Sequence, residues 1–280
     1  MKPCVDPDPN APQSVESSGG LRGDLAAALS VYLLTDPKLA AETGRSVTEI
    51  VRAAIEGGVT AVQLRAKEMD AREQWRLGLK LREMTADSGI LFFVNDRVDL
   101  ALALEADGVH LGEEDLPVAE ARRLACKAGR PGLIIGFSTA VLDYARQAVA
   151  DGASYVSVGN LFGTTRKADA GDPVGTGPLA TIARALDVPV IGIGGVTAQN
   201  APLVIEAGGV GVAVISSVAA RPDPAAAARA LAETVAGAKL RAAGAKGRIA
   251  GVKTSENLAH DAGDGAAAKP EATRGPKRVS

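Results

Sequence analysis

Two aspartates stand where two neighbouring apolar runs of strand length end. Asp96 follows the run Ile90–Val94, and Asp115 follows the run Val109–Leu111 after a short polar stretch. If the two runs are adjacent parallel strands, both carboxylates lie close together at the same end of one sheet. Such a pair is typical of a Mg²⁺ site, because Mg²⁺ in proteins binds one or two carboxylates together with substrate phosphate oxygens. Each aspartate also precedes a helical run, so a helix N-cap is the alternative role.

Basic and polar residues follow other apolar runs. Gln63, Arg65 and Lys67 alternate along the chain, so their side chains point to the same side of an extended backbone. The long loop 159–177 adds a second polar group, which consists of Thr164, Thr165, Arg166 and Lys167. Arg can neutralise a phosphate bidentately and Lys as a point charge, and a solvated loop charge is the alternative for Arg166 and Lys167.

A diglycine and a serine follow the last two apolar runs. Gly194-Gly195 and Ser216 are typical of the phosphate site at the C-terminal end of a parallel barrel, where backbone N–H groups hold an anion. A simple turn is the alternative for the diglycine. The sequence contains no evident nucleophile–base pair, and His110 inside an apolar run is interpreted as a packed polar residue. These residues together predict a site for two phosphorylated ligands.

Alternating strand and helix patterns must position these residues. The expected strands are 31–34, 59–64, 90–94, 109–111, 133–137, 155–158, 188–193 and 210–215, and the last expected helix is 224–238. The strands are nearly continuous apolar runs, as expected when both faces of a parallel sheet are buried. Eight such units within residues 25–240 predict an α/β fold, the (β/α)8 TIM barrel. A doubly wound sheet is the alternative, but no Gly-x-Gly-x-x-Gly follows the first run.

Composition limits the remaining possibilities. The 280-residue chain is 46% hydrophobic and 23% charged with a net charge of -2, which gives no argument for nucleic acid or membrane binding. Its two cysteines cannot form a disulfide framework, so a cytoplasmic location is expected. The sequence does not decide between a monomer and a homo-oligomer. Residues 1–24 are expected to be a disordered arm, and residues 241–280 a disordered, mildly basic tail.

In combination, the motifs between Val31 and Val218 resemble those of the thiamine phosphate synthase family. They are Gln63-Leu64-Arg65-Ala66-Lys67, Asn95-Asp96-Arg97, Asp107-Gly108-Val109-His110-Leu111-Gly112, Asp115, Gly136-Phe137-Ser138, Lys167, Gly192-Ile193-Gly194-Gly195 and Val214-Ile215-Ser216. The resemblance implies a transferase that couples 4-amino-2-methyl-5-(diphosphooxymethyl)pyrimidine to a thiazole phosphate, with thiamine phosphate and pyrophosphate as products. It also implies a dissociative mechanism, in which diphosphate leaves before the thiazole nitrogen traps the pyrimidine cation.

The resemblance implies a role for each matching residue. The pyrimidine diphosphate would be held by Gln63, Arg65, Lys67, Asn95, Ser138 and Lys167, of which Arg65, Lys67, Ser138 and Lys167 are expected to act in catalysis. Mg²⁺ would be held by Asp96 and Asp115. The thiazole phosphate would be held by Thr164, Gly195, Ile215 and Ser216.

The loop 159–167 departs from the family pattern. Both of its usual prolines are missing, and Arg166 replaces a threonine expected near the thiazole phosphate. Arg166 therefore either binds that phosphate itself or marks a changed second substrate. A thiazole tautomerase is one alternative function, but that relative carries a catalytic His at the position of Asn160 and lacks the equivalent of Asp96. A non-catalytic phosphate-ligand binding or regulatory barrel is another, which the retained aspartate pair disfavours.

Overall fold

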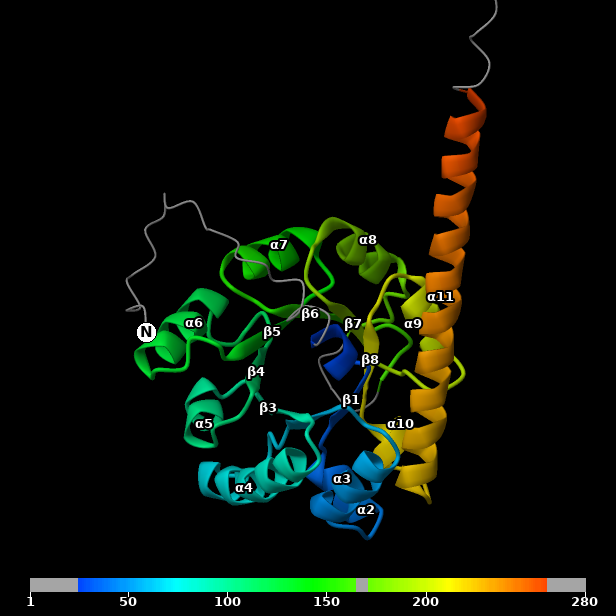
Figure 1. The fold of residues 1–280 in the computed structure, drawn as a ribbon. Helices are drawn as coiled ribbons and strands as arrows, with labels where there is room; N and C mark the ends of the chain where they lie inside the picture. Colours follow the sequence, from blue (N-terminus) through cyan, green and yellow to red (C-terminus); the bar gives the residue numbers. More distant parts are fainter. Residues whose placement is uncertain (1–24, 165–170, 261–280) are drawn as a thin grey trace, which may run out of the picture. The chain divides into compact units, whose positions relative to one another are not determined.

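Eight parallel strands close into a barrel in sequence order, from β1 round to β8 and back to β1 (Figure 1). The structure is a computed structural model, and it describes residues 25–164 and 171–260, with side chains up to residue 244. The strands are β1 (Val31–Leu34), β2 (Ala61–Leu64), β3 (Leu91–Asn95), β4 (Gly108–Leu111), β5 (Ile134–Ser138), β6 (Tyr155–Val158), β7 (Val190–Ile193) and β8 (Gly211–Val214). The predicted (β/α)8 barrel is therefore confirmed, and the open doubly wound sheet is excluded.

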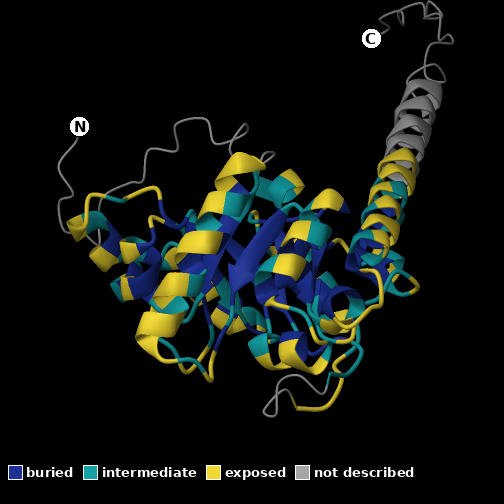
Figure 2. Cartoon of the chain, turned by 90° about the horizontal axis from the view of Figure 1, so that it is seen from below, coloured by how far each residue is buried: buried dark blue, intermediate teal, exposed yellow. Residues whose placement is uncertain are grey.

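Helices around this barrel expose their outer faces, whereas the strands at its centre are buried (Figure 2). The helices of the described residues are α2 (Pro37–Glu42), α3 (Val47–Glu56), α4 (Ala71–Asp87), α5 (Val98–Ala103), α6 (Val118–Lys127), α7 (Leu142–Ala150), α8 (Gly177–Ala185), α9 (Ala201–Glu206), α10 (Ser216–Ala219) and α11 (Pro224–His260), of which α11 extends beyond the barrel unit. Capping boxes at Ser46 and Asp70 begin α3 and α4. In the part of the chain described, no helix is long and apolar enough to cross a membrane.

Two expected strands begin two residues too early. Val59 was assigned to the second strand, but its N–H donates to the carbonyl of Ala54 at the end of α3. It therefore belongs to the helix terminus, and its burial reflects packing between helix and sheet. The seventh strand likewise begins at Val190 instead of residue 188. Apolar residues that lead from a helix into a strand cannot be separated from the strand by hydrophobicity alone.

The helix α11 differs most from the expectation. It continues to His260, beyond the predicted end at residue 238 and into the stretch expected to be disordered from residue 241. Ala, Lys and Arg are strong helix formers, and their number in this stretch outweighs its scattered glycines. By its contacts the chain divides into a unit that ends at Lys239 and a second unit that begins at Leu240. The expected disorder of residues 1–24 and 261–280 lies outside the described residues.

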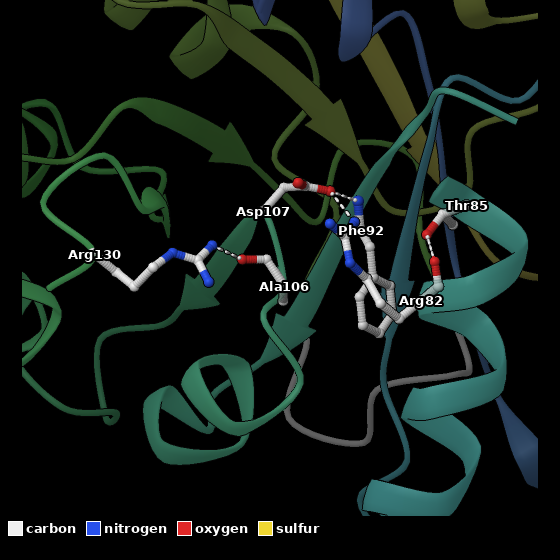
Figure 3. Close-up of polar contacts among 6 residues, drawn as sticks. All are labelled: Arg82, Thr85, Phe92, Ala106, Asp107 and Arg130. Atoms are coloured by element: carbon white, nitrogen blue, oxygen red, sulfur yellow. Dashed lines mark hydrogen bonds and ion pairs between the residues drawn. The ribbon is translucent and has the colours of Figure 1, made fainter. Parts of the chain in front are cut away.

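Polar contacts also fasten the N-terminal end of β4 (Figure 3). The Asp107 Oδ2 atom accepts hydrogen bonds from Arg82 Nη1 at 3.0 Å and from the backbone N–H of Phe92 at 2.8 Å. The neighbouring carbonyl of Ala106 accepts one from Arg130 Nη2 at 2.8 Å. Asp107 thus joins α4, β3 and β4 at the end of the barrel away from the strand C-termini, where a barrel's residues serve stability.

Candidate active site

Asp96 and Asp115 lie together at the C-terminal ends of β3 and β4, as predicted. Their carboxyl groups are close enough to hydrogen-bond to each other. Asp96 has a φ of 62°, in the left-handed region that non-glycine residues seldom adopt, and its N–H donates to the His110 carbonyl at 2.8 Å. Asp115 Oδ2 accepts from the Gly112 N–H at 2.7 Å. The backbone therefore fixes both carboxylates toward one point.

The electrostatic environment of the aspartate pair favours the binding of a cation. Burial, followed by the hydrogen bond and negative charge of Asp115, raises the pKa of Asp96 from 3.8 to about 6. Lys67 Nζ lies 3.3 Å from Asp96 Oδ2 and offsets part of this effect. Within the described ranges no group of three or more His, Cys, Asp or Glu side chains could hold a metal. A cation bound here would thus need further ligands from a substrate.

The alternative N-cap role finds no support in the helix ends. The N-cap position of α5 is Arg97 and that of α6 is Pro117, and neither cap forms a side-chain hydrogen bond. Asp96 precedes the first cap and Asp115 precedes the second by two residues. Neither Asp96 nor Asp115 therefore caps the N-terminus of these helices.

The predicted residues of β2 and β3 lie at the same C-terminal end of the barrel as the aspartate pair. Gln63 is buried near the C-terminal end of β2, and Lys67 beyond it is half exposed beside Asp96. Arg65 is held through its backbone, whose N–H and C=O both bond the hydroxyl of the buried Thr35. Asn95 ends β3 and is partly exposed. Thr35 was not predicted, because a single hydroxyl next to a strand end carries no pattern.

A chain of hydrogen bonds crosses the barrel interior and ends at two predicted substrate residues. We call its members Gln63, Tyr32, Tyr155, His110 and Ser138 the buried relay. Gln63 Nε2 donates to Tyr32 Oη at 2.8 Å, and Tyr155 Oη donates to Tyr32 Oη at 3.4 Å. The His110 ring lies between Tyr155 Oη, 2.8 Å from its Nδ1, and Ser138 Oγ, 2.7 Å from its Nε2.

The relay depends on a gap in the side-chain layer. A Cβ at Gly136 on β5 would overlap both Tyr155 and His110, so only glycine leaves room for them. The rings of Tyr32 and Tyr155 pack with Phe93, at centroid distances of 5.1 and 5.8 Å. Burial raises the pKa of both tyrosines well above their usual range, so both phenols stay protonated. Neither tyrosine was predicted, because a tyrosine in an apolar strand does not differ in pattern from a phenylalanine.

Asn160 braces the loop that follows β6. Its buried side chain accepts a hydrogen bond from the Gly163 N–H at 3.0 Å and donates one to the Gly171 carbonyl at 3.2 Å. The two ends of the loop are thereby held together. Thr164 is described at one end, whereas the predicted residues Thr165, Arg166 and Lys167 lie outside the described residues.

The predicted phosphate residues lie beyond β7 and β8. Gly194 and Gly195 both have positive φ, and a Cβ at Gly195 would overlap the Gly163 carbonyl. The diglycine is thus needed for close packing of the β6 loop. Asn200 Nδ2 donates to the Gly195 carbonyl at 3.0 Å and holds it in place.

The end of β8 leads directly into α10. Ile215 is partly buried, and the exposed Ser216 begins the short helix. The hydroxyl of Ser217 is buried and has no hydrogen-bond partner among the described residues. Since β7 and β8 are paired, the diglycine and this serine pair lie at adjacent strand ends, as predicted.

Residues 31–218 match the family model described as thiamine monophosphate synthase. The chain belongs to the thiamine monophosphate synthase family. Thiamine-phosphate synthase of Roseiflexus castenholzii is 52% identical over 206 residues, which cover 74% of this chain and 88% of that protein. The enzyme of Moorella thermoacetica is 49% identical over 209 residues, or 75% of this chain and 97% of that protein.

A solved member of the family has the same architecture. Thiamine phosphate pyrophosphorylase from Pyrococcus furiosus superposes with a TM-score of 0.69 at 40% sequence identity, covering 76% of this chain and 98% of that one. The family match confirms the resemblance drawn from the strand-end motifs. It covers β1 to β8 and therefore every strand that contributes to the candidate site.

Proposed function

We propose that this protein is a thiamine-phosphate synthase. It couples 4-amino-2-methyl-5-(diphosphooxymethyl)pyrimidine to a thiazole phosphate and releases pyrophosphate. The observation that carries the proposal is the cluster of Asp96, Asp115 and Lys67 at adjacent strand ends, in a chain that belongs to the thiamine monophosphate synthase family. A cytoplasmic location is part of the proposal and is supported by the absence of a disulfide framework.

The aspartate pair fits Mg²⁺. Burial is the main cause of the raised pKa of Asp96, and the hydrogen bond and negative charge of Asp115 add to it, so a divalent cation would stabilise both ionised carboxylates. Asp96 and Asp115 would hold the ion, with diphosphate oxygens completing its shell. When bound, Mg²⁺ would supply positive charge to the leaving diphosphate.

The basic residues supply the remaining charge stabilisation. Lys67 already points at the aspartate pair, and we assign Arg65, Lys67 and Lys167 to the oxygens of the diphosphate. Gln63, Asn95 and Ser138 would hold the pyrimidine so that the bond to the departing oxygen faces these cations. Charge stabilisation on the leaving group lowers the barrier to its departure, and no protein nucleophile is required.

The thiazole phosphate would occupy the opposite side of the barrel mouth. Gly195, Ile215 and Ser216 surround the ends of β7 and β8, and we assign them, with Thr164 and Arg166, to its phosphate group. Holding the two substrates in one mouth places the thiazole nitrogen near the reactive methylene carbon. Such positioning replaces a bimolecular encounter and is worth several kcal/mol, roughly 7–11 in the best cases.

The contacts of Asn160 disfavour a thiazole tautomerase. Both polar atoms of its side chain are engaged in bracing the β6 loop. An amide cannot act as the general base that the corresponding histidine provides, since it does not titrate near neutral pH. The structure therefore favours the synthase over the tautomerase.

The test is turnover by the purified full chain. The protein would be mixed with the pyrimidine diphosphate, the thiazole phosphate and Mg²⁺, and thiamine phosphate and pyrophosphate would be measured. Stoichiometric formation of both products is expected, and their absence with fresh substrates would refute the synthase. Interconversion of thiazole isomers without coupling would instead identify a tautomerase, and binding of either ligand without turnover a regulatory barrel.

A further inference from the structure

We propose that Tyr32 and Tyr155 are positioning residues that hold the proton of His110 on Nδ1 and thereby set the hydrogen-bonding direction of Ser138. The proposal concerns the buried relay, which is separate from the phosphate-binding residues at the barrel mouth. Its inner members are fully enclosed, since Tyr32 and Tyr155 are 1% and 0% exposed. The order of protons along the relay can therefore be followed from one side chain to the next.

The donor–acceptor order of the relay is set first by the hydroxyl groups of Tyr32 and Tyr155. Tyr155 Oη donates its only proton to Tyr32 Oη, which also accepts from Gln63 Nε2. Because that proton is used, Tyr155 Oη can only accept in its 2.8 Å contact with His110 Nδ1. The proton of a neutral His110 imidazole must then reside on Nδ1.

The same order continues to Ser138. With its proton on Nδ1, His110 presents a lone pair at Nε2, 2.7 Å from Ser138 Oγ. Ser138 therefore donates its hydroxyl proton to the histidine and offers only lone pairs to a ligand. At the other end of the relay, Gln63 Nε2 is used by Tyr32, and its Oε1 is buried with no partner among the residues described. Both ends of the relay thus present acceptors.

Two acceptors select a ligand that carries N–H donors. On the proposed function, which this step requires, the matching group is the exocyclic amine of the aminopyrimidine. A pyrimidine with a carbonyl oxygen in its place would set acceptor against acceptor and leave buried groups unpaired, which is unfavourable. The relay is therefore a specificity device that distinguishes an aminopyrimidine from an oxopyrimidine.

The proton position can be measured in the ligand-free protein. The chain has two histidines, His110 and His260, so ¹⁵N-histidine labelling gives two imidazole spectra, and a His260→Gln variant assigns them. At pH 7.5 we expect His110 to show a protonated Nδ1 and an unprotonated Nε2. A protonated Nε2 in the wild-type protein would overturn the proposal, whether or not the protein is a synthase.

Tyr32→Phe is the decisive variant because Tyr32 does not contact His110. Without Tyr32 Oη, the Tyr155 proton is free to turn toward Nδ1, and the His110 proton is expected to move to Nε2. Tyr144→Phe is the matched control, since Tyr144 is an exposed tyrosine outside the relay. A folded Tyr32→Phe protein that keeps the wild-type tautomer would contradict the proposed order.

Ligand selectivity gives an independent measurement. Dissociation constants of the 4-amino and 4-oxo pyrimidine monophosphates would be measured by calorimetry for both tyrosine variants and the wild type. We expect Tyr32→Phe to reduce the ratio of the 4-oxo to the 4-amino dissociation constant by about tenfold. The KM for thiazole phosphate should stay unchanged. An unaltered preference would sink the specificity role. Failure of the wild type to form thiamine phosphate would instead count against the proposed function and leave the tautomer result intact.

Discussion

Replacing Asp96 by asparagine should stabilise the metal-free protein while nearly abolishing its activity. The carboxyl of Asp96 is partly buried and lies against Asp115, and its burial and this neighbour raise its pKa to about 6. Asparagine has nearly the same shape without the charge. It also tolerates the φ of 62° at this position better than most residues, so the change adds no backbone strain.

The size of the gain follows from the pKa. An isolated aspartate has a pKa of 3.8, so ionised Asp96 costs the folded state about 3 kcal/mol at about 1.4 kcal/mol per pKa unit. Well below pH 3.8 the carboxyl is protonated in both states and the cost is absent. As pH rises from about 4 to 6 the folded state binds more protons than the unfolded state, so this group lowers stability progressively. Above that window the full cost remains.

The assay is chemical denaturation of the metal-free wild type and of Asp96→Asn between pH 4.5 and 8. We expect the variant to be more stable by about 1–3 kcal/mol at pH 7.5, with the difference shrinking on acidification. Asp99→Asn is the control, because the contact with Arg97 lowers the pKa of Asp99 and its removal should not stabilise the fold. In the coupling assay we expect turnover by Asp96→Asn to fall at least about 100-fold.

Two results would refute this reasoning. An Asp96→Asn variant that is no more stable than the wild type at pH 7.5 would show that ionised Asp96 does not destabilise the folded state. Near-normal turnover with Mg²⁺ would show that the carboxylate does not serve the leaving group.

Three further predictions concern other parts of the barrel. Asp107→Asn should lower the free energy of unfolding by about 1–3 kcal/mol, because a charged acceptor of two hydrogen bonds is lost. A change in KM for either substrate would contradict a purely structural role of Asp107. Gly195→Ala should raise the KM for thiazole phosphate about tenfold or more, since the new Cβ would overlap the Gly163 carbonyl; steady-state kinetics with an unchanged value would exclude a role of the diglycine in that site. Lys67→Met should lower kcat by at least about tenfold. It should also raise the pKa of Asp96 further, because the cation 3.3 Å away is removed. Carbon NMR of the Asp96 carboxyl would detect this change as a higher titration midpoint.

The barrel was predictable because its strands are buried on both faces and therefore appear as continuous apolar runs. The position of Asp96 and Asp115 was predictable for a related reason: parallel strands end on one side, so residues after successive strands must meet. The relay was not predictable, because Tyr32 and Tyr155 satisfy the apolar pattern and reveal their hydroxyl partners only in three dimensions. Of its members, His110 was interpreted as a packed polar residue, and burial confirms the packing but not the absence of a role.

The failures of prediction have local causes. Composition suggested a disordered stretch from residue 241, but its helix formers continue α11 to His260. The helix α2 was not among the expected elements, although Asp36 accepts from the Leu39 N–H and caps a helix there. The catalytic roles assigned to Arg65, Ser138 and Lys167 stay predictions until variants are measured.

Gly136 limits how this barrel can change over evolution. Any side chain at this position would overlap Tyr155 and His110, and because the overlap includes the ring carbon Cζ, exchanging tyrosine for phenylalanine would not relieve it. A substitution at Gly136 alone would therefore disrupt the packing, and a larger residue there requires a much smaller side chain at position 155 and a change at position 110 at the same time. We expect positions 136, 155 and 110 to vary together or not at all among natural and selected variants, so the buried relay would be inherited or lost as one unit.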